Sequence, residues 1–265
     1  MTHSGMFDTS EPEWVNTAVK TFCTLVILLS SILLLLAVDD GASDAGFLHP
    51  NSWKNTGDWS VAGSISGSRT EKKWKSIKPV AGAPGAGVLY NGAKGKTTNI
   101  VSKTSHGDVE VLAEFMIPKS SNSGIYFMQR YEVQILDSFG KSDDAISVHD
   151  CGAIYERWDD AKEGKDKGFE GTVPLTNAST APGTWQKFQI KFRAPRFSPD
   201  GKKSENARFV LVEQNGVVIH QDVEVTGPTR GGMGGTEVAS APFTIQGDHG
   251  PVAFRKFEVK DITLP

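Results

Sequence analysis

The stretch DVEVLAEFMI, residues 108–117, alternates apolar and acidic side chains and predicts a β-strand that is buried on one face. Its apolar positions share one side of such a strand: Val109, Val111, Ala113, Phe115 and Ile117. The acidic residues Asp108, Glu110 and Glu114 share the other side, because side chains alternate along a strand with a period of two. This pattern is typical of an antiparallel sheet that packs one face on a core.

Similar patterns recur on both sides of this stretch. In residues 188–193, aromatic and aliphatic residues alternate with polar ones, and residues 209–225 predict a hairpin because Asn215-Gly216 suits a tight type I′ turn. Further strands are expected at 59–65, 86–90, 123–129, 131–137, 152–157, 243–247 and 252–260. About ten strands with almost no helix predict an all-β fold, a two-sheet antiparallel β-sandwich.

Composition places the chain among ordinary globular proteins and excludes several classes. The chain has 265 residues, of which 38% are hydrophobic and 22% charged, so it can bury a core. Two cysteines exclude a disulfide-dense scaffold and a zinc site of the CxxC kind. Residues 1–45 hold one lysine and six acids, and the rest of the chain is nearly neutral, so we expect no nucleic-acid partner.

The N-terminal region contains one long apolar stretch, residues 21–38, with no charged side chain. A helix of that length spans roughly 27 Å, close to the hydrocarbon thickness of a bilayer. The leader 1–20 is long and acidic, which favours an uncleaved transmembrane anchor over a secretory signal; a buried core helix is a third interpretation. We expect an extracytoplasmic domain, periplasmic or at the cell surface, either membrane-anchored or secreted. A linker over 39–46 leads to the β-sandwich domain, 47–265.

The stretch SNSGIYFMQRYEVQILDS, residues 121–138, combines a core pattern with a polar one. The period of two puts Val133 and Ile135 on the core face, and Glu132 and Gln134 on the opposite face. On the concave sheet of a sandwich, a carboxylate beside an amide can bind sugar hydroxyls or move a proton. An ordinary exposed sheet face is the alternative interpretation.

Four stretches follow one another in order: SNSGIYFMQRYEVQILDS, HDCGAIYERW (149–158), PLTNASTAPGTWQKFQIKFRAPRFSPDGKK (174–203) and APFTIQGDHGPVAFRKFEV (241–259). Together they resemble the 3-keto-disaccharide hydrolase domain family, over residues 47–264. The resemblance implies a concanavalin A-like lectin/glucanase jelly roll, in agreement with the strand pattern. It also implies a carbohydrate substrate that a separate oxidoreductase has first oxidised at carbon 3.

The run that begins at Glu132 supplies no second carboxylate on the same strand face, so the two-carboxylate mechanism of a conventional glycosidase is poorly supported. Gln134, Leu136 and Ser138 follow on the same face, and Asp137 falls on the opposite one. A 3-keto sugar offers another route, because the ketone acidifies the carbon 2 hydrogen and permits elimination of the carbon 1 substituent. We therefore expect a glycosidase-type hydrolase that acts on 3-keto-glycosides and 3-keto-disaccharides by elimination and hydration.

The candidate catalytic residues are Glu132 and His249, because each can give or take a proton; their order of action is open. The candidate substrate-binding residues carry amide, guanidinium or phenol groups: Asn122, Arg130, Gln134, Tyr155 and Gln246. Gly247 interrupts the Gln-Asp-His-Gly order usual in the family. If this insertion displaces His249, the alternative function is a non-catalytic, membrane-tethered, lectin-like carbohydrate-binding module.

No cofactor motif stands out, and no metal ligand is assigned. Asp137, Asp143, Asp144 and Asp150 could supply oxygen ligands for a structural calcium, but they lack the spacing of an EF-hand loop. We expect them to be solvated loop acids. The charged run 159–167 predicts another surface loop.

Overall fold

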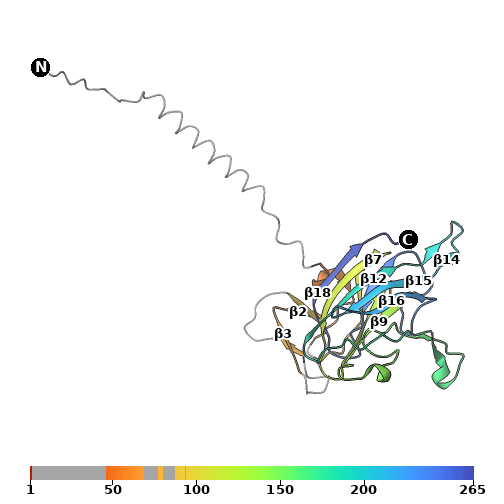
Figure 1. The fold of residues 1–265 in the computed structure, drawn as a ribbon, viewed down its shortest axis with the longest axis horizontal. Coiled ribbons are helices and arrows are strands. Elements are labelled where there is room, and N and C mark those ends of the chain that lie inside the picture. Colours follow the sequence, from red (N-terminus) through yellow and green to blue (C-terminus); the bar gives the residue numbers. More distant parts are fainter. Residues whose placement is uncertain (2–45, 69–76, 80–86, 93) are drawn as a thin grey trace. The chain divides into compact units, whose positions relative to one another are not determined.

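The computed structural model describes residues 1, 46–68, 77–79, 87–92 and 94–265, shown in colour in Figure 1. Apart from Met1 and Gly46, the predicted leader, apolar segment and linker lie outside the described residues. Within the described ranges, no helix is long and apolar enough to cross a bilayer. The sandwich belongs to one compact unit, Ala45–Pro265.

Two antiparallel sheets form a β-sandwich, which confirms the predicted all-β fold. The smaller sheet has the strand order β1 (Trp53–Lys54), β6 (Ile100–His106), β17 (Ala241–Ile245), β8 (Asn122–Phe127) and β9 (Tyr131–Leu136). The larger sheet has the order β16 (Val217–Val225), β15 (Ala207–Gln214), β12 (Trp185–Arg193), β7 (Val109–Met116), β18 (Ala253–Asp261), β5 (Val88–Tyr90) and β2 (Ser60–Ala62). Figure 1 shows β18, β7, β12, β15 and β16 side by side.

Among the described residues, three two-stranded ladders and several short 3₁₀ turns lie outside the two main sheets. The two-stranded ladders are β3 (Ile65–Gly67) with β4 (Ile77–Pro79), β10 (Arg157–Trp158) with β11 (Gly168–Phe169), and β13 (Arg196–Phe197) with β14 (Lys203–Glu205). The helical turns of the described residues are all 3₁₀: η1 (Gly46–Leu48), η2 (Pro50–Ser52), η4 (Asp143–Ala145) and η5 (Gly164–Lys167). The charged run 159–167 connects β10 to β11 and is largely exposed, as predicted.

The core between the sheets follows the predicted alternation. Along β7, buried residues alternate with partly exposed ones, and Val133 and Ile135 of β9 are fully buried. The rings of Phe127, Phe192 and Phe209 lie 5.1 to 5.3 Å apart between centroids. Each buried phenylalanine contributes about 1.5–3 kcal/mol to the stability of the fold.

Turn chemistry and strand polarity explain where the strand predictions succeeded and failed. Asn215 and Gly216 have φ angles of 54° and 83°, which confirms the tight turn between β15 and β16. Strand β6 was not predicted, because its second half, from Lys103 onward, is polar and shows no alternation. Its pairing with β1 and β17 forms it in spite of that pattern.

Candidate functional site

The face of the smaller sheet that points away from the core collects polar side chains in rows. Strand register pairs Thr244 with Tyr126 and Tyr126 with Glu132. Side chains directly opposite on neighbouring strands share a face, so these three form one row. Beyond β9, the backbone N–H of Tyr155 donates to the carbonyl of Glu132 at 3.0 Å, so the ladder continues and Tyr155 lies beside this row.

This face forms the floor of a pocket of about 280 Å³, which we call the Glu132 pocket. Its lining residues are Asn122, Tyr126, Glu132, Gln134, Tyr155, Arg230, Gly231, Gln246 and His249. The structure therefore brings together both candidate catalytic residues and every candidate substrate-binding residue except Arg130.

Glu132 lies deep in this pocket, with 2% of its surface exposed. Gly124 makes room for it, because a Cβ atom on Gly124 would overlap the Glu132 carboxyl group. Burial raises the pKa of Glu132 from 4.5 to about 8; a hydrogen bond with Tyr126 opposes this rise and the charge of Asp248 adds to it. Glu132 therefore holds a proton at neutral pH and is suited to donate it.

Two phenols stand on either side of Glu132. Burial raises the pKa of Tyr126 far above its ordinary value, and the neighbouring Glu132 raises it further. Burial and the charges of Glu132 and Glu156 also raise the pKa of Tyr155, against a hydrogen bond with Arg230. Both phenols therefore keep their protons at neutral pH.

Arg130 was expected to contact substrate, but its side chain is directed elsewhere. Its guanidinium donates to the carbonyl of Met128 at 2.6 Å and to the carbonyls of Gly234 and Thr236. The side chain is buried and does not line the Glu132 pocket. The physical reason is that Arg130 lies in the turn between β8 and β9, where the alternation of a strand no longer fixes the side-chain direction.

Arg130 instead holds the glycine-rich segment GPTRGGMGG, residues 227–235, onto that turn. The N–H groups of Thr229 and Met233 donate to the carbonyls of Arg130 and Gln129, both at 2.8 Å. A Cβ atom on Gly234 would collide with the Arg130 guanidinium, which explains a glycine at that position. The turn therefore fixes the path of this glycine-rich segment.

The same segment delivers Arg230 to the pocket. The Arg230 guanidinium lies 3.6 Å from the centre of the Trp158 ring, a cation–π contact that orients it. It also hydrogen-bonds Tyr155. The arginine that lines the pocket is therefore Arg230 and not Arg130, for which the sequence predicted this role.

His249 lies at the exposed edge of the pocket, and the Gly247 insertion does not remove it from there. Gly247 is buried; its N–H donates to Asn99 Oδ1 at 2.9 Å, and its carbonyl accepts from Asn91 Nδ2 at 3.0 Å. His249 Nδ1 lies 2.6 Å from Asp248 Oδ1. A carboxylate partner at Nδ1 favours the tautomer in which Nε2 is the basic nitrogen.

Two side-chain oxygens of the pocket lining have the capacity to accept hydrogen bonds from a ligand. Asn122 Oδ1 and Gln246 Oε1 are buried and have no hydrogen-bond partner among the described residues. A buried acceptor without a donor costs about 1–3 kcal/mol. Hydroxyl groups of a bound sugar are suitable donors for both oxygens.

Comparison with known proteins identifies the family of the chain. Residues 49–260 match the family described as the 3-keto-alpha-glucoside-1,2-lyase-like domain. The chain belongs to this family. The resemblance inferred from its four motifs is therefore confirmed. No curated protein matches the chain.

Solved structures that resemble this lyase-like domain are distant from it in sequence. A "putative glycosyl hydrolase" from Parabacteroides distasonis is 23% identical, with 80% of this chain and 84% of that chain covered and a TM-score of 0.51. A second structure of that description from the same organism is 17% identical, with 68% and 89% covered and a TM-score of 0.44. The carbohydrate-binding module CBM66 from Bacillus subtilis is 9% identical, with 77% and 96% covered and a TM-score of 0.36. At these identities the likeness of the first concerns the sandwich fold alone.

The aspartates considered for calcium do not fit a metal site, and the prediction that all are solvated is wrong for Asp150. Asp150 is fully buried and accepts hydrogen bonds from Ser138, Lys141 and Ser147. Burial alone would raise the pKa of Asp150, but these bonds lower it overall. Asp143 likewise accepts from Thr176. Within the described ranges, no group of three or more His, Cys, Asp or Glu side chains could hold a metal ion.

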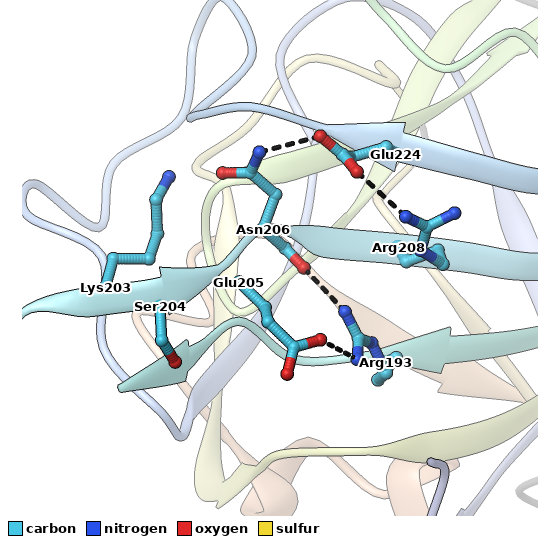
Figure 2. Close-up of a pocket in the computed structure, with 7 residues that line it drawn as sticks. All are labelled: Arg193, Lys203, Ser204, Glu205, Asn206, Arg208 and Glu224. Atoms are coloured by element: carbon cyan, nitrogen blue, oxygen red, sulfur yellow. Dashed lines mark hydrogen bonds and ion pairs between the residues drawn. The ribbon is translucent and has the colours of Figure 1, made fainter. Parts of the chain in front are cut away.

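A second, larger pocket of about 520 Å³ lies on the other sheet and the β14 ladder (Figure 2). We call it the Arg193 pocket; its lining residues are Arg193, Lys203, Ser204, Glu205, Asn206, Arg208 and Glu224. Each of its cations is paired with a carboxylate: Arg193 with Glu205 at 2.5 Å, Arg208 with Glu224 at 2.8 Å, and Lys203 with Glu237 at 2.6 Å. Its charges cancel locally, so its size alone does not make it the functional site.

Sequence reasoning missed several residues that build the Glu132 pocket. Tyr126 follows Asn122 and Gly124 at even spacing on one strand, so the period of two could have placed it there. Arg230 lies in a glycine-rich segment whose path no periodicity predicts. Asn91 is more than 150 positions from the residues it holds, and its amide contacts the carbonyls of Gly247 and Gly250.

Proposed function

We propose that the protein eliminates the carbon 1 substituent from 3-keto-glucosides and then hydrates the unsaturated product. The observation that carries this proposal is a buried carboxyl group, Glu132, whose pKa burial raises to about 8, in the same pocket as His249, in a chain of the 1,2-lyase-like family. One acid and one base in a single pocket meet the needs of an elimination.

The raised pKa of Glu132 supports a role as the acid, with His249 as the base, in the order of action that the sequence left open. His249, through Nε2, takes the hydrogen from carbon 2, and the electrons of that bond form the double bond between carbons 1 and 2. The bond from carbon 1 to the leaving oxygen breaks, and Glu132 gives its proton to that oxygen. No electrons are gained or lost, so the step needs no redox partner.

Arg230 is suited to hold the ketone at carbon 3. The developing enolate carries negative charge, and Arg230 contributes a permanent positive charge to the pocket lining. Gln134 and Asn122 add amide groups on the floor. Such preorganised donors stabilise an enolate more strongly than they stabilise the neutral ketone.

The unsaturated product is hydrated by the same groups in reverse. Water adds at carbon 1 and gives its proton to Glu132, while carbon 2 receives a proton from His249. The result is a free 3-keto sugar, and both side chains return to their starting protonation states.

The test compares a 3-keto-glucoside with its unoxidised parent. We expect release of the aglycone from the keto substrate alone, with deuterium at carbon 2 when the reaction runs in heavy water. Equal cleavage of both compounds would replace this mechanism with direct glycoside hydrolysis. Binding of sugar without cleavage would leave the carbohydrate-binding module, which the unpartnered oxygens of Asn122 and Gln246 would also support.

We propose that this chemistry takes place outside the cytoplasmic membrane, because residues 21–38 are apolar enough to serve as an anchor or a signal. N-terminal sequencing of the native protein separates the two possibilities. Recovery of the full-length chain from the soluble cytoplasm would contradict both.

A further inference from the structure

His249 lies in the loop 246–252, which connects β17 to β18. A base must keep its place relative to the carbon 2 hydrogen, because a displacement of about 1 Å can slow a reaction by about 10²-fold. The side chain of His249 is 53% exposed, so the protein interior encloses it only in part. The path of the loop backbone therefore has a large share in placing the ring.

Asn91, directly after β5 of the larger sheet, holds this loop at three points. Its Nδ2 donates to the carbonyl of Gly247 at 3.0 Å and to the carbonyl of Gly250 at 2.7 Å. Its Oδ1 accepts from the N–H of Val252 at 2.8 Å. Asn91 is 1% exposed, so water does not readily replace these bonds. One buried amide thus fixes the backbone on both sides of the two residues that include His249.

The loop is also packed closely against the start of β8. Ser121 Oγ donates to the carbonyl of Pro251 at 2.7 Å. A Cβ atom on Gly250 would lie 2.3 Å from the same oxygen, so no larger residue fits there without a shift. The loop therefore has little freedom to move as long as Asn91 holds it.

We propose that Asn91 is a positioning residue for the elimination: its amide fixes the loop on both sides of His249 and so holds Nε2 of that ring at carbon 2. This inference rests on the proposed function and adds to it a residue of the larger sheet that does not line the Glu132 pocket. Each of the two N–H groups of Nδ2 serves one carbonyl. Loss of either bond would release one end of the segment that carries His249.

The Asn91→Asp variant tests this role, because it keeps the size of the side chain and removes both N–H donors. In the full-length protein with a 3-keto-glucoside, we expect kcat to fall by about 10- to 10²-fold, since His249 is no longer held in place. KM should stay within about twofold, because Gln134 and Arg230 still bind the sugar. Asn91→Ser introduces no charge and should lower kcat in the same way, which covers the case in which the buried carboxylate prevents folding.

A double variant with His249→Ala separates positioning from general loosening of the fold. Because Asn91 acts through His249, Asn91→Asp should add no further loss to the residual turnover of His249→Ala. The matched control is Asn177→Asp. Asn177 Nδ2 also donates to two carbonyls, those of Ser138 at 2.8 Å and Lys141 at 2.9 Å, outside the Glu132 pocket. This control should lower stability and leave kcat within about twofold.

Two results would overturn this role of Asn91 while the proposed function stands. One is a loss in the double variant that equals the product of the two single losses, which would mean that Asn91 does not act through His249. The other is a kcat of the folded Asn91 variants as close to wild type as that of Asn177→Asp. A wild-type protein inactive on 3-keto-glucosides would overturn the proposed function and this inference with it.

Discussion

The Glu132 pocket and the Arg193 pocket are both polar, but they differ in whether their charged groups form ion pairs. In the Arg193 pocket each cation meets a carboxylate near the surface. In the Glu132 pocket a carboxyl group is buried without a cationic partner of its own among the described residues, and its pKa rises to about 8 as a result. The larger pocket pairs its charged groups, and the smaller one buries a carboxyl group without such a pair.

This contrast, rather than pocket size, favours the Glu132 pocket as the functional site. Paired surface charges contribute little free energy and leave no group poised to react. A buried, protonated carboxyl group costs stability, and folds retain such costs mainly at functional sites. The Glu132 pocket also keeps the buried oxygens of Asn122 and Gln246 without partners in the described part of the chain.

The largest expected effect is on turnover in Glu132→Gln. The amide keeps the shape of the protonated acid but cannot transfer its proton, so kcat on a 3-keto-glucoside should fall by about 10²- to 10⁴-fold. Glu205→Gln removes a carboxylate from the Arg193 pocket and should leave kcat within about twofold. Equal losses of kcat in the two variants would mean that the Glu132 pocket is no more important for turnover than the Arg193 pocket.

The pH dependence of stability should show the same distinction. Between pH 4.5 and about 8 the folded state keeps a proton on Glu132 that the unfolded state has released, so stability falls as the pH rises through this window. The loss amounts to roughly 3–5 kcal/mol at about 1.4 kcal/mol per pKa unit.

Urea unfolding of wild type and Glu132→Gln across that range measures the difference. The variant should gain stability relative to wild type as the pH rises, with most of the gain complete just above pH 8. Parallel stability curves would show that Glu132 ionises with an ordinary pKa and would remove its role as the acid at neutral pH.

A smaller effect is expected at the two arginines near the pocket. Arg230→Met should lower kcat by about 10²-fold, because it removes a donor to the enolate. Arg130→Met should lower it by about tenfold, because it loosens the segment that carries Arg230. Since Arg130 acts through Arg230, the double variant should be no slower than Arg230→Met alone. Additive losses would give Arg130 a role of its own.

Much of the fold follows from local pattern, as β7 and β9 show. Their alternation placed Val111 and Val133 in the core, and it also placed Glu132 and Gln134 together on the opposite face. Strand β6 escaped prediction because pairing with its neighbours, rather than its own polar sequence, makes it a strand.

Strand alternation predicted only part of the site, namely Glu132 and Gln134. Tyr155, Gln246 and His249 lie outside the strands and were predicted from the motifs that carry them. The alternation argument failed for Arg130 because that residue lies in a turn whose central residues, Met128 and Gln129, have positive φ angles of 53° and 60°. Neither residue type signals such a turn, so the direction of the next side chain could not be inferred. Arg230 and Asn91 reach the site through long-range contacts that one sequence does not reveal.

The smallest effect is expected in the Arg193 pocket itself. Glu224 accepts hydrogen bonds from Arg208 and from Asn206, both at 2.8 Å, and the Arg208 and Glu224 side chains are 27% and 47% exposed (Figure 2). Water and salt screen an ion pair of this exposure, so Glu224→Gln should lower the free energy of unfolding by less than about 1 kcal/mol. The difference should shrink further in about 1 M salt, where the screening length is only about 3 Å. Urea unfolding at low and high salt measures both. A loss well above 1 kcal/mol that survives high salt, or a fall in kcat, would mean that the Arg193 pocket is as strained and as functional as the Glu132 pocket.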